Sequence, residues 1–327
     1  MWDQKRVLVT GGSGFIGSHL VESLVNLGAS VTIIDDLSRG RYENLKKVSN
    51  KINFIQANLT NTTTKNYFVD NEIVFHLACP IGGVKLMLNN QLLSSVIPLI
   101  DKNVYDSCIK YNIEKMLYVS TACAYPTFLQ TENYGDYSLR EEDAFIFGAK
   151  PESLYGWGKV YGEFLGQTYH KESGLKVSIV RPFNVYGPRE NFELDKSHVI
   201  PSLIRRAVYK ESPFHVWGTG EQSRSFLYVT DAVKGMINAV ENTSNAIPIN
   251  IGAMERIKIK DLALKILKIT GHDTNLSFDI SEPTGVFTRA PDISRARKLI
   301  KWEPTVGLDE GLKLTVDWFR NETTMNK

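Results

Sequence analysis

Four side chains near the middle of the 327-residue sequence have the types and spacing of an acid–base site. Tyr155 and Lys159 are four residues apart, so on a helix they share one face. A lysine ammonium beside a phenol favours the phenolate, and the spacing therefore predicts a lowered pKa for Tyr155 and a base that works near neutral pH. Ser120 and Thr121 end the preceding apolar segment, and their hydroxyls could share the proton of a bound alcohol with Tyr155.

A glycine-rich turn near the N-terminus has the pattern of a phosphate-binding site. It follows an apolar segment at 6–10 and precedes a helical pattern, and its glycines are Gly11, Gly14 and Gly17. Such a turn lets a pyrophosphate approach the backbone and the free N–H groups of the helix start. Asp35 ends the next apolar segment, where a carboxylate accepts hydrogen bonds from an adenosine ribose and repels a 2′-phosphate. We expect a dinucleotide site that prefers NAD to NADP, a preference that nearby Arg39 and Arg41 weaken slightly.

Apolar segments alternate with longer helical patterns through the first half of the chain, which is typical of repeated βαβ units. We expect strands at 6–10, 30–35, 53–56, 73–77, 115–121 and 177–182, and helices at 15–27, 90–111 and 153–172. The strand segments are apolar at nearly every position, as in strands that are covered on both faces. The expected fold class is therefore α/β, a Rossmann-type doubly wound parallel sheet.

The sequence changes in character after Pro182, where polar stretches and shorter mixed elements lead to a helical pattern at 308–321. A chain of this length corresponds to about two domains. We place an NAD-binding domain at 1–183 and a smaller, mainly substrate-binding lobe at 184–327, with residues 225–252 returning to the first domain.

Composition excludes several classes of protein. Hydrophobic residues make up 43% and charged residues 23%, and 38 basic against 36 acidic side chains leave a formal charge of +2. These values argue against disorder and against a protein that binds nucleic acid through a strongly basic surface. No apolar run approaches the roughly 18 residues of a membrane span, and the start of the chain lacks a signal-peptide pattern, so we expect a cytoplasmic protein with no membrane partner. Three cysteines without a C-x-x-C pair predict neither a disulfide framework nor a metal site.

Taken together, these residues resemble the extended short-chain dehydrogenase/reductase family of nucleotide-sugar epimerases and dehydratases. The resemblance extends over nearly the whole chain. It includes Leu77-Ala78 and the segments at 181–188, 217–226, 229–231, 250–252 and 301–304. It implies a nucleoside-diphosphate sugar as substrate and a tightly held NAD that takes a hydride from the sugar to leave a ketone.

The resemblance also implies roles for further residues. Around the cofactor it adds Phe15, Ile16, Asn58, Leu59 and Leu77 to the glycines, Asp35, Tyr155 and Lys159. For the substrate it implies a sugar-binding glycine loop at Gly82 and Gly83, polar contacts from Asn184 and Gln222, and diphosphate contacts from Arg206, Arg224 and Arg289. Guanidinium groups suit paired contacts to phosphate.

Two further residues could invert a carbon of the sugar. Residues 120–126 resemble a segment of GDP-mannose 3,5-epimerase and GDP-L-fucose synthase, which carry a cysteine where this chain has Cys123. Residues 197–206 are close to the fucose synthase segment whose histidine is an acid, here His198, where the 3,5-epimerase has lysine. Oxidation at C4 makes the C3 and C5 hydrogens acidic, and inversion then needs a base on one face and an acid on the other. Both Cys123 and His198 can exchange protons at neutral pH.

The leading expectation is therefore an NAD-dependent epimerase that resembles GDP-mannose 3,5-epimerase. Alternatives are a UDP- or GDP-hexose 4-epimerase, which needs neither Cys123 nor His198, a fucose-synthase-like reductase that consumes NADPH, and a non-catalytic NAD-binding regulator. Dehydratases and decarboxylases of the family carry a carboxylate just after the strand-end Ser/Thr, and the stretch 122–124 here has none. Apolar residues beyond one face of the helices at 90–111 and 153–172 predict a homodimer. Those named for the first helix are Leu92, Leu93, Val96, Ile97 and Ile100.

Overall fold

A seven-stranded sheet forms the centre of the molecule. The computed structural model describes residues 2–146, 150–194 and 196–325. All seven strands are parallel, in the order β11-β6-β5-β4-β1-β2-β3. Their bounds are β1 Arg6–Thr10, β2 Ser30–Asp35, β3 Ile52–Gln56, β4 Ile73–His76, β5 Lys115–Val119, β6 Lys176–Pro182 and β11 Asn245–Ile251. The Rossmann-type doubly wound sheet expected from the sequence is confirmed.

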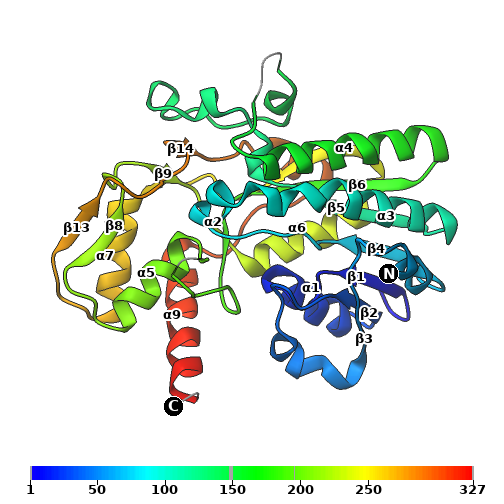
Figure 1. The fold of residues 1–327 in the computed structure, drawn as a ribbon, viewed down its shortest axis with the longest axis horizontal. Coiled ribbons are helices and arrows are strands. Elements are labelled where there is room, and N and C mark those ends of the chain that lie inside the picture. Colours follow the sequence, from blue (N-terminus) through cyan, green and yellow to red (C-terminus); the bar gives the residue numbers. More distant parts are fainter. Residues whose placement is uncertain (1, 147–149, 195, 326–327) are drawn as a thin grey trace.

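Helices cover both faces of this sheet, as Figure 1 shows. α3 (Ile97–Lys110) and α4 (Leu154–Ser173) lie on one face, and α1 (Phe15–Asn26) and α6 (Val229–Asn242) on the other. The apolar residues of β1 explain this arrangement, because Val7 and Val9 pack with α1 and α6 whereas Leu8 packs with α3. A strand with both faces buried needs apolar side chains at consecutive positions.

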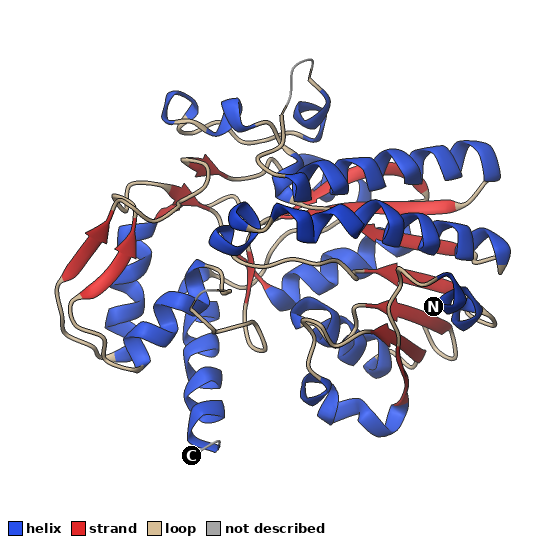
Figure 2. Ribbon diagram, in the orientation of Figure 1, coloured by secondary structure: helices blue, strands red, loops and turns tan. Residues whose placement is uncertain are grey.

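A smaller lobe lies beside the carboxyl ends of the strands (Figure 2). Its helices are α5 Val199–Val208, α7 Ile259–Thr270 and α9 Leu308–Met325, and α2 Val84–Asn89 and α8 Ser294–Ile300 lie outside it. Its short strands are β8 Phe214–Trp217 paired with β13 Leu276–Asp279, and β12 Ile257–Lys258 with β9 Ser223–Arg224 and β14 Thr288–Arg289. A further pair is β7 Val185–Tyr186 with β10 Leu227–Tyr228. The lobe has an apolar core of its own. The division at residues 183 and 184 stays a prediction, although β11 does join the main sheet beside β6.

The helix expected at 90–111 is wrong in its first turns. Residues Gln91–Val96 form a 3₁₀ segment, and the α-helix begins at Ile97 with a proline in its first turn. Proline suits a helix start because its missing N–H would have no helical partner there. Ile97 and Ile100 are buried within the chain, so they cannot contribute to a dimer surface, whereas Leu92 is 82% exposed.

Helix α4 packs closely against neighbouring segments because small residues face them. A Cβ at Gly156 would lie 2.4 Å from the Cys123 carbonyl oxygen, and one at Gly158 would lie 3.2 Å from Ile97 of α3. The helix ends at Gly174, which has a left-handed φ of 71°. Within the described residues, no helix is both long and apolar enough to cross a membrane.

Candidate active site

One cavity of about 1070 Å³ lies between the carboxyl ends of the main strands and the small lobe. Most residues that the sequence selected line this cavity, although they come from every part of the chain. They are Gly11, Gly14, Phe15, Ile16, Gly17, Asp35, Leu59, Leu77, Gly82, Thr121, Cys123, Tyr155, Lys159, Asn184, His198, Arg206, Gln222, Arg224 and Arg289. Asn58 and Gly83 do not line it. A ligand site at this edge of a parallel sheet is the usual arrangement for such folds.

The turn between β1 and α1 fits a dinucleotide phosphate. A Cβ at Gly17 would lie 2.1 Å from the Gly11 carbonyl oxygen, so the closed turn requires glycine there. No side chain caps Gly14, the N-cap residue of α1. The buried Ser13 hydroxyl has no hydrogen-bond partner in the described part of the chain. The start of α1, whose first residues line the cavity, therefore presents unused backbone donors where a phosphate would lie.

Asp35 is held beside this turn at the end of β2. Its two carboxylate oxygens accept the backbone N–H groups of Ser13 at 3.0 Å and Leu37 at 2.9 Å. Arg39 is engaged elsewhere, because its Nε donates to the Ile81 carbonyl at 2.8 Å. Asn58 is engaged in its own turn and donates to Asp36 at 3.2 Å, while its neighbour Leu59 lines the cavity. Asp35 is thus fixed beside the glycine turn, and Arg39 and Arg41, the two cations expected to weaken its preference for NAD, line the same cavity.

Tyr155 lies in the first turn of α4 and is buried. Burial raises the pKa of its phenol well above the ordinary value, the thiols of Cys79 and Cys123 raise it further, and a hydrogen bond with Thr121 opposes the rise. The lowered pKa predicted from the Tyr155–Lys159 spacing is therefore wrong for the protein alone. The Lys159 ammonium lies 4.1 Å from the centre of the Tyr118 ring instead. Desolvation of the phenol is the largest cause of this shift.

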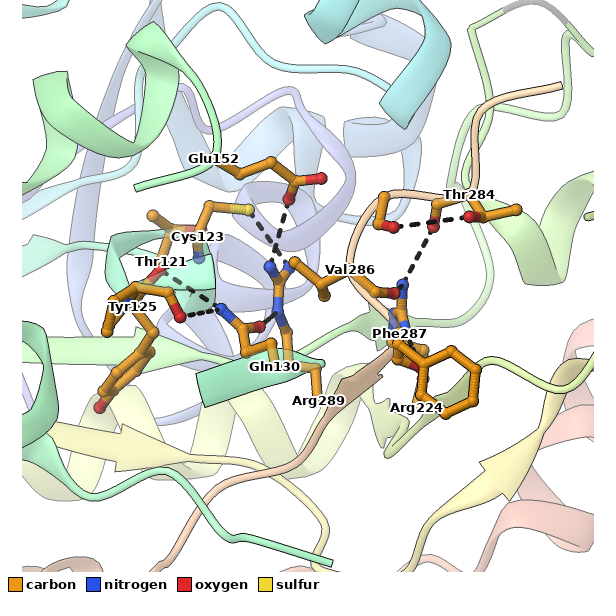
Figure 3. Close-up of polar contacts among 12 residues, drawn as sticks. Thr121, Cys123, Tyr125, Gln130, Glu152, Arg224, Thr284, Val286, Phe287 and Arg289 are labelled. Atoms are coloured by element: carbon orange, nitrogen blue, oxygen red, sulfur yellow. Dashed lines mark hydrogen bonds and ion pairs between the residues drawn. The ribbon is translucent and has the colours of Figure 1, made fainter. Parts of the chain in front are cut away.

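Cys123 lies beside a buried arginine, as Figure 3 shows. Arg289 donates from one terminal nitrogen to the Cys123 sulfur at 3.4 Å and from the other to Glu152 at 3.3 Å. Its Nε donates to the Gln130 side chain at 2.5 Å. The Cys123 backbone N–H donates to the Thr121 hydroxyl at 3.1 Å, and the Cys123 side chain packs against the apolar cluster that contains Tyr155. Arg289, expected to contact a diphosphate, thus contacts the proposed catalytic thiol in this structure.

The other predicted substrate residues differ in the hydrogen-bond and ion-pair partners that they already have within the protein. Arg224 donates to the backbone carbonyls of Thr284 and Phe287 at 3.0 and 3.1 Å, and burial together with the charge of Arg289 lowers its pKa to about 9. Arg206 pairs with Glu211 at 2.7 Å. Gln222 donates to the Trp217 carbonyl, and Asn184 to the Ser225 carbonyl. Arg224 bonds to backbone carbonyls, whereas Arg289 has the carboxylate of Glu152 as a partner, so Arg224 is the cation that favours an anionic ligand.

His198 is the N-cap residue of α5, and its side chain is half exposed to the cavity. Its Nδ1 lies 2.6 Å from a carboxylate oxygen of buried Glu190. Burial lowers the pKa of the imidazole, but the hydrogen bond and the charge of Glu190 outweigh it, so the net pKa is raised. The Gly82 backbone also hydrogen bonds to this imidazole. Gly83 packs behind it and donates to the Lys196 carbonyl at 3.0 Å. Gly82 of the glycine loop and His198 at the start of α5 thus lie together on one wall of the cavity.

Sequence reasoning missed Glu152 and Glu190, the two carboxylates that partner Arg289 and His198. Glu190 lies eight residues before His198 in an irregular segment, and Glu152 precedes α4, where it reads as a helix-start residue. The spacing carries no signal for either contact, because neither pair lies on one element. Among the described residues, no group of three or more His, Cys, Asp or Glu could hold a metal ion.

Comparison with known proteins places these residues in a family context. The sequence model of the NAD dependent epimerase/dehydratase family matches residues 7–252. A curated relative, the UDP-N-acetyl-alpha-D-glucosaminuronate decarboxylase of Bacillus cytotoxicus, is 32% identical over 332 residues, which are 97% of this chain and 98% of the relative.

Solved structures that are similar to this chain also include enzymes named for nucleotide sugars. UDP-glucose 4-epimerase from Thermotoga maritima, solved with UDP-glucose, is 30% identical with a TM-score of 0.88, over 97% of this chain and 99% of that one. UDP-glucuronic acid 4-epimerase from Bacillus cereus, solved with UDP-glucuronic acid and NAD, is 28% identical with a TM-score of 0.84, over 97% and 99%. These proteins act on or bind UDP-sugars, and none of them is named for GDP-mannose.

Proposed function

Because the chain belongs to the NAD-dependent epimerase/dehydratase family, we propose that it epimerises a nucleoside-diphosphate hexose through a C4-keto intermediate, with inversion at C3 or C5. It is an enzyme that uses NAD, which accepts the C4 hydride when bound and later returns it. The observation that carries the proposal is the position of Cys123. Its thiol lies on the cavity wall beside Thr121 and Tyr155, where the residue type suits proton exchange and not hydride transfer.

The C4 step requires a base for the sugar hydroxyl. Tyr155 takes this proton, and its hydrogen bond with Thr121 orients the phenol toward the same substrate oxygen. Lys159 follows one turn later on α4 and holds the cofactor ribose through its ammonium. This assignment uses only residues that line the cavity.

The C3 or C5 step requires a second acid–base pair. Cys123 removes the proton from the carbon next to the ketone, and the cation of Arg289 at 3.4 Å stabilises the negative sulfur that does so. His198 supplies a proton on the other face of the enolate, since Glu190 keeps its imidazole charged to higher pH than usual. The Glu190 pair also orients the ring.

Other reactions of the family are less well supported. The stretch Ala122-Cys123-Ala124 lacks the carboxylate that the resemblance places there in decarboxylases, so we do not propose decarboxylation. A UDP-hexose 4-epimerase is the second candidate, favoured by the 30% identical Thermotoga maritima structure. In that reaction the keto sugar is reduced on its other face, and Cys123 and His198 only pack against it.

The substrate assignment has two parts. Arg224 is buried and bonds to backbone carbonyls, so its charge favours a diphosphate or another anionic group beside it. A GDP-mannose-type hexose is the candidate from sequence segments 120–126 and 197–206, and UDP-sugars are the candidates from the relatives. A panel of GDP- and UDP-hexoses separates these options by product formation.

Solvent deuterium tests the carbon that is inverted. With the right sugar in deuterated water, a 3,5-type epimerase places deuterium at C3 or C5, whereas hydride return at C4 exchanges nothing with water. Cys123→Ala and His198→Asn should each suppress this exchange while transient NAD reduction at 340 nm persists, because C4 oxidation belongs to Tyr155. A C4-epimer formed without deuterium, by enzyme and both variants alike, would establish the 4-epimerase instead.

We also propose that two copies of the chain pair through the surface that carries Leu92 and α4. Leu92 is 82% exposed, and Leu99, Trp157, Tyr161 and Phe164 are each between 46% and 51% exposed. A cluster of large apolar side chains on one side of a protein marks an interaction site. We call these five residues the α4 surface.

A further inference from the structure

Beneath the proposed catalytic lysine lies a row of buried polar residues that the proposed mechanism does not use. Thr10, His76 and Tyr118 are side by side on β1, β4 and β5, because Thr10 is in register with His76 and His76 with Tyr118. All three are fully buried on the face that α3 and α4 cover, and Asp101 of α3 is buried above them. Buried polar groups in such a place need partners.

Hydrogen bonds connect the row into one chain. The Thr10 hydroxyl lies 2.7 Å from His76 Nδ1, His76 Nε2 lies 2.9 Å from one Asp101 oxygen, and the Tyr118 hydroxyl donates to the other at 2.6 Å. Burial lowers the pKa of His76, so the ring is neutral. One tautomer of the neutral ring satisfies every group: Nε2–H donates to Asp101, and Nδ1 accepts the Thr10 hydroxyl proton.

The two ends of this chain lie at the two halves of the cofactor site. At one end, the Thr10 hydroxyl accepts the Ala78 N–H at 3.3 Å, directly before the glycine turn. At the other, the Tyr118 ring lies 4.1 Å from the Lys159 ammonium. α4 approaches closely at this point, because a Cβ at Gly162 would lie 2.0 Å from the Tyr118 hydroxyl. No carboxylate forms an ion pair with Lys159 in the described part of the chain, so the aromatic face is its support.

We propose that Tyr118 is a positioning residue for Lys159, and that Asp101, His76 and Thr10 hold Tyr118 in register with the glycine turn. The phenyl ring supports the ammonium, and the chain of hydrogen bonds ties the ring to the strand that leads into the phosphate-binding turn. The inference rests on the cofactor contact that the proposed function gives to Lys159. It requires no particular sugar.

The test measures the dissociation constant of NAD without any sugar. Lys159→Ala gives the loss of NAD affinity that follows from complete removal of the ammonium. Tyr118→Leu removes the ring and should raise the dissociation constant of NAD by about tenfold or more, in line with the strength of a buried cation–π contact. Tyr118→Phe keeps the ring but removes its hydrogen bond to Asp101, so it should weaken NAD binding by no more than about threefold. A large loss in Tyr118→Leu and a small loss in Tyr118→Phe would separate the contribution of the ring from that of the hydroxyl.

Tyr105→Leu is the matched control. Tyr105 is equally buried, and its hydroxyl donates to the Gly162 carbonyl of the same helix at 3.2 Å, but its ring does not contact Lys159. Tyr105→Leu should therefore lower thermal stability as Tyr118→Leu does, yet leave the NAD dissociation constant unchanged. Equal loss of NAD affinity in both Leu variants, or no loss in Tyr118→Leu or in Lys159→Ala, would overturn the proposal.

A double-substitution cycle tests the hydrogen-bonded chain. Asp101→Ala and Tyr118→Phe each remove the hydrogen bond between these two side chains, so the double variant should bind NAD no more weakly than the more affected single variant. Additive losses of NAD affinity would show that Asp101 does not act through Tyr118. They would overturn the role proposed for the hydrogen-bonded chain. Failure of the sugar panel described above would leave all these NAD measurements intact, so the two proposals fail separately.

Discussion

At the scale of single residues, Tyr155 combines burial with the task of a base. Its pKa is raised by burial, so at neutral pH the phenol holds its proton in the protein alone. Only a small fraction of the molecules then carries Tyr155 as phenolate, and this fraction increases with pH. We expect the rate of NAD reduction by sugar to rise with pH through the neutral and mildly alkaline range. Stopped-flow absorbance at 340 nm across that range measures it.

Substitution of the same residue gives a second expectation. Tyr155→Phe removes the phenol oxygen, so turnover should fall by about two to four orders of magnitude while NAD affinity stays within a few fold. Tyr169→Phe is the control, because Tyr169 lies on the same helix but bonds to Asp106 outside the cavity. Near-normal turnover in Tyr155→Phe would mean that another group takes the proton.

Asp35 carries the expected choice between the two dinucleotides. A fixed carboxylate next to the ribose repels the 2′-phosphate of NADP, so the unmodified protein should bind NAD more tightly. Asp35→Asn keeps the size of the side chain and removes the charge, and should narrow the ratio of the two dissociation constants by about tenfold. Titration of each cofactor measures this ratio, and equal affinities in the unmodified protein would contradict the assignment.

At the scale of elements, a buried ion pair joins β6 to α4 and holds the segment that carries Cys123. Arg181 makes two bonds to Glu163, at 2.8 and 2.6 Å, and donates to the Tyr125 hydroxyl at 3.0 Å. Ser120 also donates to Glu163. These contacts fix both ends of the stretch 120–125, so the position of the thiol depends on them.

The losses of stability from removing either partner of this ion pair should not add. Glu163→Gln or Arg181→Met alone leaves an unpaired buried charge and should lower the free energy of unfolding by about 3–5 kcal/mol. The double variant Glu163→Met, Arg181→Met should lose less than the sum of the two single changes. Urea denaturation measures these values. Replacement of the exposed pair Lys265 and Asp309 is the control, with an expected change of about 0.5 kcal/mol or less.

At the scale of the whole molecule, the α4 surface predicts a dimer. Sedimentation velocity at micromolar concentration should show two chains, and the double variant Leu99→Glu, Phe164→Glu should sediment as one, because charges in an apolar interface oppose association. Phe278→Glu is the control. It changes an equally exposed aromatic residue, 44% exposed, on the small lobe and should leave the dimer intact. A monomer in the unmodified protein would refute the interface.

Short sequence patterns determine much of the fold of this protein. The alternation of apolar and helical segments determines the parallel sheet, since strands covered on both faces must be apolar at consecutive positions, as at Val7, Leu8 and Val9. The glycine turn, Asp35 and the Tyr155–Lys159 pair are short-range motifs, so their geometry follows from one turn or one helix. For that reason the fold, the family and NAD as the cofactor could be predicted from the chain alone.

The partners of those residues depend on packing between distant segments. Glu190 reaches His198 from an irregular segment, and Glu152 and Gln130 reach Arg289 from two others, with no periodic spacing to indicate the contacts. The sign of the Tyr155 pKa shift was missed for the same reason, because desolvation depends on everything that surrounds the phenol and not on the residue four positions away. Burial, and with it the strength of each charge, is a property of the assembled fold.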